Sequence, residues 1–220
     1  SFGAHGILTL STLAGFAPGK LIGAAFGAHF VLARTENDAS ETPLEEDNWV
    51  AAIEWADSIG IDVASTSLGY LDFDAPFPSF TWQDMDGNTT VITRAADLAV
   101  ARGIVVVNSA GNNGLDPTHN TLIGPADGDS VIAVGAVDTL GVRASFSSVG
   151  PTTDFPARIK PDIDACGVRV RCASSSIPTD YRTASGTSLS CPLAAGVAAL
   201  LVSARPAATP AATATTHRSR

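Results

Sequence analysis

The sequence has few charged residues and few cysteines, and these shortages argue against several classes of protein. Only 16% of its 220 residues are charged, and 13 Lys and Arg against 22 Asp and Glu give a formal net charge of -9. Because phosphate contacts need clustered basic side chains, we expect no nucleic-acid partner. The three cysteines suit neither a disulfide scaffold nor a metal site. They indicate buried thiols, with a Cys166–Cys172 bridge as the alternative.

Long hydrophobic runs are also missing. The apolar run 197–202 is too short to cross a bilayer, and no secretory signal begins at Ser1. Hydrophobic residues nevertheless make up 45% of the chain, which is typical of a compact globular protein. We therefore expect a sizeable core and no membrane partner. The domain is expected over residues 1–203, and the Ala/Thr/Pro-rich residues 204–220 are expected to form a tail or linker.

Apolar runs that alternate with helical patterns predict the fold class. The expected strands are 31–33, 61–67, 104–107, 131–134 and, more weakly, 168–170. One helix is expected after a capping box at 42–45, with Trp49, Ile53 and Ala56 on one face and Gly60 at its end. A second is marked by Val91, Ala95 and Leu98 and ended by Gly103. Such an order favours an α/β fold with a mostly parallel sheet covered by helices on both faces.

The most informative motif is Gly186-Thr187-Ser188-Leu189-Ser190-Cys191-Pro192, which leads into an apolar helical stretch. It places a serine at the start of a helix, where free backbone N–H groups and the helix dipole stabilise negative charge. Pro192 is expected in the first helical turn, where its missing N–H is not needed. The alternative is an ordinary buried helix with a Ser/Thr cap.

Two further segments complete a set of groups suited to acyl transfer. His5 precedes a run of small and apolar residues and could act as a base, and Asn112 follows the most apolar strand and could donate from its amide. Residues 67–69 and 108–114 both follow strands. We expect them at the carboxyl edge of the sheet, where sites form in such folds.

Taken together, these motifs resemble the subtilisin-like serine proteases, or subtilases. Residues 186–196 match the family pattern G-T-S-x-S-x-P-x-x-A-G throughout, and His5-Gly6-Ile7 corresponds to H-G-T with Ile7 in place of threonine. Further matches, in family order, are Ser67-Leu68-Gly69, Ala110-Gly111-Asn112, and residues 17–20, 136–138, 144–147 and 160–162.

The resemblance implies a three-layer subtilisin-like fold and a serine endopeptidase. It implies Ser188 as nucleophile, His5 as general base and then acid, and Asn112 with the Ser188 N–H as oxyanion donors. The residues it implies for substrate binding are Ser67, Leu68, Gly69, Ala110 and Gly111. The implied partners are a polypeptide substrate and an inhibitory pro-segment, and the implied location is extracellular. No organic cofactor is implied, and structural calcium is left open with no residue assigned.

One element of the family pattern is not found. The family order is Asp, His, Ser, and none of residues 1–4 is acidic. We therefore expect a domain incomplete at its N-terminus, with little or no protease activity in the fragment. A non-catalytic module that keeps the peptide groove is the alternative. A nucleotide binder is disfavoured, because the chain has no G-x-G-x-x-G and no P-loop.

Several acidic residues gather just before and at the start of the helix that is predicted after the capping box at 42–45. We expect them to form a solvated loop and helix start, with a preference for basic or polar substrate residues as the functional alternative. They are Glu36, Asp38, Glu41, Glu45, Glu46 and Asp47.

Overall fold

A parallel β-sheet forms the centre of the computed structural model, which describes residues 4–177 and 179–205. Within these residues the sheet has the strand order β3-β4-β5-β6. The strands are β3 (Val63–Thr66), β4 (Val105–Ser109), β5 (Ile132–Val137) and β6 (Ile163–Cys166). All five residues of β4 are buried, which is typical of a strand covered on both faces.

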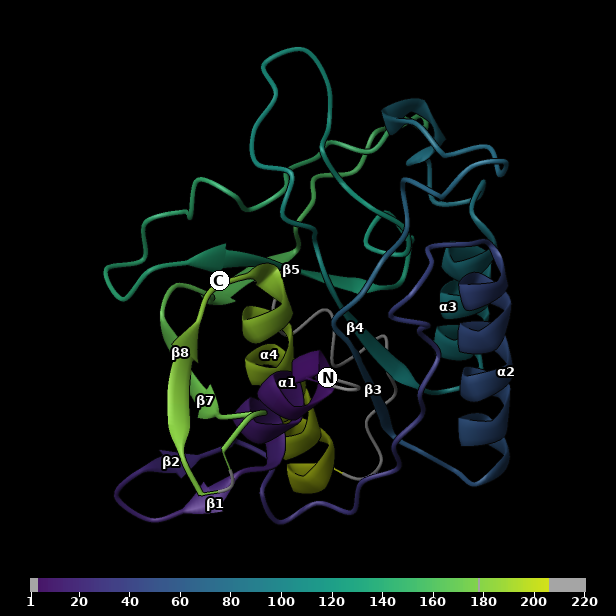
Figure 1. The fold of residues 1–220 in the computed structure, drawn as a ribbon. Coiled ribbons are helices and arrows are strands. Elements are labelled where there is room, and N and C mark those ends of the chain that lie inside the picture. Colours follow the sequence, from purple (N-terminus) through teal and green to yellow (C-terminus); the bar gives the residue numbers. More distant parts are fainter. Residues whose placement is uncertain (1–3, 178, 206–220) are drawn as a thin grey trace.

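Helices cover both faces of this sheet (Figure 1). On one face lie α2 (Leu44–Ser58) and α3 (Val91–Ala101), and on the other lie α1 (Ala4–Ala14) and α4 (Thr187–Ala204). Side chains alternate along β4, so Val106 packs in one core cluster with Trp49 and Ile92, whereas Val105 and Val107 pack in the other with residues of α4. The predicted three-layer α/β fold is confirmed.

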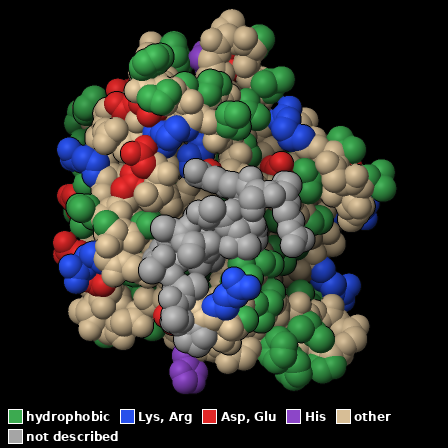
Figure 2. Space-filling view, turned by 180° about the vertical axis from the view of Figure 1, so that it is seen from behind, with side chains coloured by type: hydrophobic (Ala, Val, Ile, Leu, Met, Phe, Trp, Pro, Cys, Tyr) green, Lys and Arg blue, Asp and Glu red, His purple; other side chains and the backbone are tan. Residues whose placement is uncertain are grey.

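Two antiparallel hairpins lie outside the central sheet. They are β1 (Phe16–Ala17) with β2 (Leu21–Ile22), and β7 (Val170–Ala173) with β8 (Tyr181–Ala184). Phe16, Ile22 and Phe26 are exposed at the first hairpin, and the rings of Phe16 and Phe26 stack with centroids 4.7 Å apart. Figure 2 shows hydrophobic side chains gathered toward the lower right, on the side of the molecule that carries this hairpin.

Two of the predicted strands are wrong. Residues 31–33 form no strand, and the side chains of Val31 and Leu32 are exposed. Their backbone pairs with no described strand, and apolar character alone does not make a strand without a neighbour. The predicted strand at 168–170 is also wrong, because residues 168 and 169 lie between β6 and β7 and only Val170, the first residue of β7, is in a strand. The sequence of β6 includes Asp164, and its pairing with β5 rather than its own hydrophobicity makes it a strand.

The helix that Val91, Ala95 and Leu98 predict is confirmed as α3. The residues that it buries are Ile92, Thr93, Ala96 and Ala99, whereas Val91 and Leu98 are exposed. Helix α3 packs against α2, and the Glu46 carboxylate accepts the backbone N–H of Ile92 at 3.1 Å. On α2 the predicted face is correct, because Trp49, Ile53 and Ala56 are all buried.

The sequence suggested that the acidic residues 36–47 are solvated, but two of them are buried. Glu45 and Glu46 are each only 2% exposed. Glu45 accepts the backbone N–H groups of Asn37 and Thr42, both at 2.8 Å, so it satisfies donors of the preceding loop. The bond to Thr42 is half of the predicted capping box, and the Thr42 side chain makes no cap. Burial raises the pKa of Glu46.

The expectation that no apolar segment is long enough to span a membrane is wrong for helix α4. Its 18 residues satisfy that criterion by length and composition. A core helix satisfies the same criterion, and α4 packs on all four strands of the central sheet. The predicted tail falls almost wholly on residues 206–220, which lie outside the described residues.

The acidic loop before α2 generates a pH-dependent contribution to stability. Burial, followed by repulsion from Glu45, Glu36 and Asp74, raises the pKa of Glu41 from 4.5 to about 7. The folded state therefore holds this proton more tightly than the unfolded chain does. The stability that the proton provides is complete below pH 4.5 and is lost as the pH rises toward 7.

We predict that Glu41→Gln removes this loss. At pH 8 the variant should be more stable than the wild type by about 1 kcal/mol, less than the full shift implies because solvent screens a partly exposed carboxylate. Urea unfolding at pH 4 and pH 8 measures the difference. Glu54→Gln, at an exposed position of α2, is the matched control. An unchanged difference between wild type and Glu41→Gln at the two pH values would contradict the prediction.

Candidate active site

Ser188 is the second residue of α4 and is only partly buried. Gly186 precedes the helix with φ of +153°, a conformation that side chains rarely adopt, so glycine is needed at the turn. Because the first N–H groups of a helix have no intrahelical acceptor, the Ser188 hydroxyl lies beside free backbone donors. The local sequence thus places a hydroxyl where negative charge is stabilised.

Asn112 lies against this helix terminus. Its Oδ1 accepts the backbone N–H of Thr187 at 2.9 Å and the Thr187 hydroxyl at 3.1 Å. Because a backbone N–H can only donate, these bonds assign Oδ1 to the helix and turn the Nδ2 amino group elsewhere. The Nδ2 group has no hydrogen-bond partner within residues 4–177 and 179–205, so it can donate to a ligand.

Ser67 joins the carboxyl end of β3 to the same helix terminus through two reciprocal hydrogen bonds. Its hydroxyl donates to the Ser188 carbonyl at 2.9 Å, and the Ser188 hydroxyl donates to the Ser67 carbonyl at 3.3 Å. Behind this segment, the Asn108 side chain donates to the Leu68 carbonyl at 3.2 Å. The segment 67–69 is therefore held from two sides.

Pro192 explains why the Ser188 carbonyl is free to accept. The sequence predicts it in the first turn, but it is the sixth residue of α4 and lies inside the helix. In an α-helix the donor to the Ser188 carbonyl would be the N–H of residue 192, and proline has none. The Ser67 hydroxyl replaces that donor. A proline four residues after the serine is the sequence signal for this contact, which the sequence analysis missed.

His5 lies in the first turn of α1, a helix that packs against α4 (Figure 1). The structure brings Ser67, Asn112 and Ser188 together by hydrogen bonds, but none of the described residues forms a hydrogen bond or ion pair with His5. Although the residue is exposed, nearby atoms desolvate the ring and lower its pKa. The imidazole is therefore neutral at pH 7 and can accept a proton.

The three cysteines are free thiols, so the alternative Cys166–Cys172 bridge is not formed. Cys191 is three residues after Ser188, but its Sγ faces the backbone carbonyls of Thr66 and Val107 at 3.3 and 3.4 Å. Burial raises its pKa to about 11, so the thiol stays protonated. It packs the helix on the sheet and is not a nucleophile.

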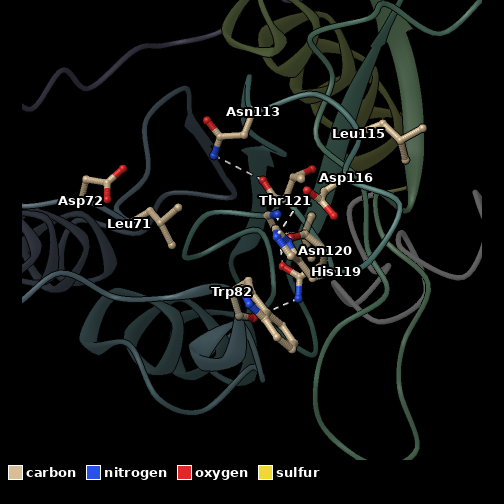
Figure 3. A pocket seen from close by; sticks show the side chains of 10 residues that line it. Leu71, Asp72, Trp82, Asn113, Leu115, Asp116, His119, Asn120 and Thr121 are labelled. Atoms are coloured by element: carbon tan, nitrogen blue, oxygen red, sulfur yellow. Dashed lines mark hydrogen bonds and ion pairs between the residues drawn. The ribbon is translucent and has the colours of Figure 1, made fainter.

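A cavity of about 300 Å³ lies beside this site (Figure 3). Its lining includes Asn113, the residue after Asn112, but not Ser188, His5 or Asn112 itself. The His119 ring stacks on Trp82 with centroids 5.2 Å apart. His119 and Trp82 therefore form part of the cavity wall together, which is a structural role for this histidine.

The acidic segment around Asp86 forms a turn. The Asp86 carboxylate accepts the backbone N–H groups of Asn88 and Thr89, both at 2.7 Å. In the part of the chain that the structure describes, no group of three or more His, Cys, Asp or Glu side chains could hold a metal ion.

Comparisons with known proteins agree with the geometry. The model of the subtilase family, peptidase S8, matches residues 1–218. Subtilisin DY from Bacillus licheniformis is 42% identical over 158 residues, which are 71% of this chain and 48% of that protein. The membrane-bound transcription factor site-1 protease of Rattus norvegicus is 34% identical over 92% of this chain and 17% of its own length.

A solved structure of a cold-adapted subtilisin-like serine proteinase superposes with a TM-score of 0.73. It is 26% identical and covers 98% of this chain and 67% of its own. The chain thus spans about half the length of the Bacillus relative and less of the rat one.

We predict that Ser67→Ala lowers the free energy of unfolding by about 1–2 kcal/mol, because the Ser188 carbonyl loses its side-chain donor. Adding Pro192→Ala restores an N–H that can donate to the same carbonyl. The double variant should therefore be more stable than the sum of the two single effects allows. Urea unfolding of the four proteins gives the coupling. Strict additivity would show that the two residues do not share this acceptor.

Proposed function

This chain belongs to the subtilase family, and on that basis we propose that it is the part of a serine endopeptidase that carries the nucleophile Ser188. The observation that carries the proposal is the pair of reciprocal hydrogen bonds between Ser67 and Ser188, with Asn112 held on the adjacent Thr187. A hydroxyl, an unpaired amide donor and an extended backbone segment meet there. Because the chain spans part of its relatives, the activity of the whole protein is part of the proposal.

In the proposed reaction, the Ser188 Oγ attacks the carbonyl carbon of the scissile peptide bond. His5 takes the hydroxyl proton, and the carbonyl oxygen becomes negative as the tetrahedral intermediate forms. Asn112 Nδ2 and the Ser188 backbone N–H donate to that oxygen. His5 then gives its proton to the leaving amine, and water hydrolyses the acyl-enzyme by the reverse sequence of proton transfers.

The substrate is proposed to be a polypeptide in an extended conformation. The segment Ser67, Leu68 and Gly69 continues from β3 and would pair with substrate backbone, as an added strand pairs with a sheet edge. Ala110 and Gly111 would border the other side of the pocket for the residue before the scissile bond. No step requires a cofactor, and by resemblance alone we infer an extracellular location and an inhibitory pro-segment.

A second function follows from the surroundings of His5. Among the described residues, no carboxylate contacts its ring. In serine proteases, loss of the carboxylate that orients the catalytic histidine lowers kcat by about 10⁴-fold. That observation favours a module that binds peptides in the same groove without cleaving them. The two functions differ in whether Ser188 reacts.

Labelling with an alkyl fluorophosphonate, read by intact mass, separates the two functions. We expect one adduct in the wild type, none in Ser188→Ala, and an adduct in Ser190→Ala, which changes the other serine of the motif. The labelling rate should fall as the pH drops and His5 becomes protonated. The midpoint of this fall should lie below pH 6.5, because desolvation lowers the pKa of His5 from that value. A folded wild-type chain that takes no label would favour the peptide-binding function.

Asn112→Asp tests the oxyanion donor with little change in shape. The carboxylate can still accept from Thr187, but it cannot donate to the negative oxygen. We predict that the labelling rate falls by about 10²–10³-fold while the melting temperature changes little. Asn113→Asp is the neighbouring control. Equal labelling rates for Asn112→Asp and the wild type would remove Asn112 from the proposed machinery.

A further inference from the structure

Ile123 lies between the two backbone segments that we assign to substrate binding. A Cβ atom built on Gly69 would lie 2.8 Å from both Cγ1 and Cδ1 of Ile123. A Cβ atom built on Gly111 would lie 3.2 Å from Cγ1 of the same side chain. Real Cβ atoms rarely come so close to other atoms. The Ile123 side chain therefore lies close to both glycines. Neither position has room for a side chain of its own, since the Gly124 carbonyl oxygen at Gly69 (2.6 Å) and the Ser148 hydroxyl at Gly111 (2.7 Å) are closer still.

The backbone around Ile123 is fixed. Tyr70 N–H donates to the Gly124 carbonyl at 2.9 Å, and Gly124 N–H donates to the Tyr70 carbonyl at 3.1 Å. The Ile123 carbonyl accepts the Ala126 N–H at 2.9 Å. A Cβ atom on Gly124 would lie 2.7 Å from the Thr90 hydroxyl, so the backbone at Gly124 lies close against the start of α3. Because isoleucine is also stiff at χ1, its side chain has little freedom to move aside.

Part of the Ile123 side chain remains accessible. Its neighbours Leu122 and Gly124 are buried, whereas Ile123 is only partly buried. Ala110, on the opposite segment, is fully buried. A ligand group that enters between residues 67–69 and 110–111 would therefore meet the isoleucine methyl groups. It would meet no charged side chain from those two segments, since neither contains one.

We propose that Ile123 is the floor of the pocket for the residue before the scissile bond and that it restricts this residue to a small apolar side chain such as that of alanine. The proposal rests on the proposed function, which puts the substrate backbone along residues 67–69. An aromatic side chain entering between Gly69 and Gly111 would need the space that Ile123 holds. Differences in size at an apolar pocket change selectivity by about 10–200-fold, which sets the effect to look for.

The first experiment measures covalent reaction of the protein with two peptidyl phosphonates that differ only in the residue before phosphorus, alanine or phenylalanine. We expect the alanine probe to react with Ser188 at least about 10-fold faster in the wild type. In Ile123→Ala the phenylalanine probe should become the faster one. Ile159→Ala, at an exposed isoleucine outside the site, should keep the wild-type preference. Thermal unfolding confirms that each variant is folded.

A second measurement does not need a reactive serine. Acetylated peptides that end in alanine or phenylalanine are titrated against Ser188→Ala, with and without Ile123→Ala, and binding is followed by NMR. Tighter binding of the alanine peptide, reversed by Ile123→Ala, supports the proposal even if no phosphonate reacts. In that case the protease function fails while the role of Ile123 stands.

Three outcomes would overturn the proposal. They are a wild-type preference for phenylalanine in either measurement, a folded Ile123→Ala variant with unchanged preference, and the absence of both labelling and peptide binding. The first two leave the serine chemistry in place if the simple alkyl fluorophosphonate still labels Ser188. The third removes the groove itself.

Discussion

The junction between the end of β3 and the start of α4 organises this molecule. Pro192 deprives the Ser188 carbonyl of its helical donor, and the Ser67 hydroxyl supplies the missing bond. The Ser188 hydroxyl returns a bond to the Ser67 carbonyl. Because β3 is tied to β4 by parallel pairing and α4 packs on all four strands, this junction fixes Ser188 relative to the sheet. Asn112 and Ile123 are then placed by segments that follow β4 in the chain.

Buried polar groups do much of the positioning outside this junction. Glu45 satisfies two backbone donors of the loop before α2, and Glu46 reaches across to the first turn of α3. Asn108 reaches from β4 to the Leu68 carbonyl. Each side chain holds a backbone segment that no regular helix or strand would hold. Composition suggested a solvated acidic loop, but two of its carboxylates became internal acceptors because the loop has donors to satisfy.

The chain matches the subtilase motifs closely at the site, but it covers only part of the length of its relatives. The family model matches residues 1–218, yet the chain covers 48% of the Bacillus relative and 67% of the superposed proteinase. The β3 strand is at one edge of the described sheet, and the apolar residues Val31 and Leu32 are exposed. His5 has no carboxylate partner among the described residues.

The sequence by itself determined the fold class, the helix that presents Ser188 and the order of the motifs, because glycine turns, apolar runs and helix periodicity are local signals. It also placed residues 67–69 and 108–114 correctly at the carboxyl edge of the sheet. Only the tertiary structure decided which segments become strands, since Val31 pairs with no described strand whereas β6 pairs with β5. It also decided which face α3 buries, where the Ser188 carbonyl finds its donor and what fills the space between Gly69 and Gly111. Each of these depends on atoms from segments far apart in the chain, and no local pattern contains that information.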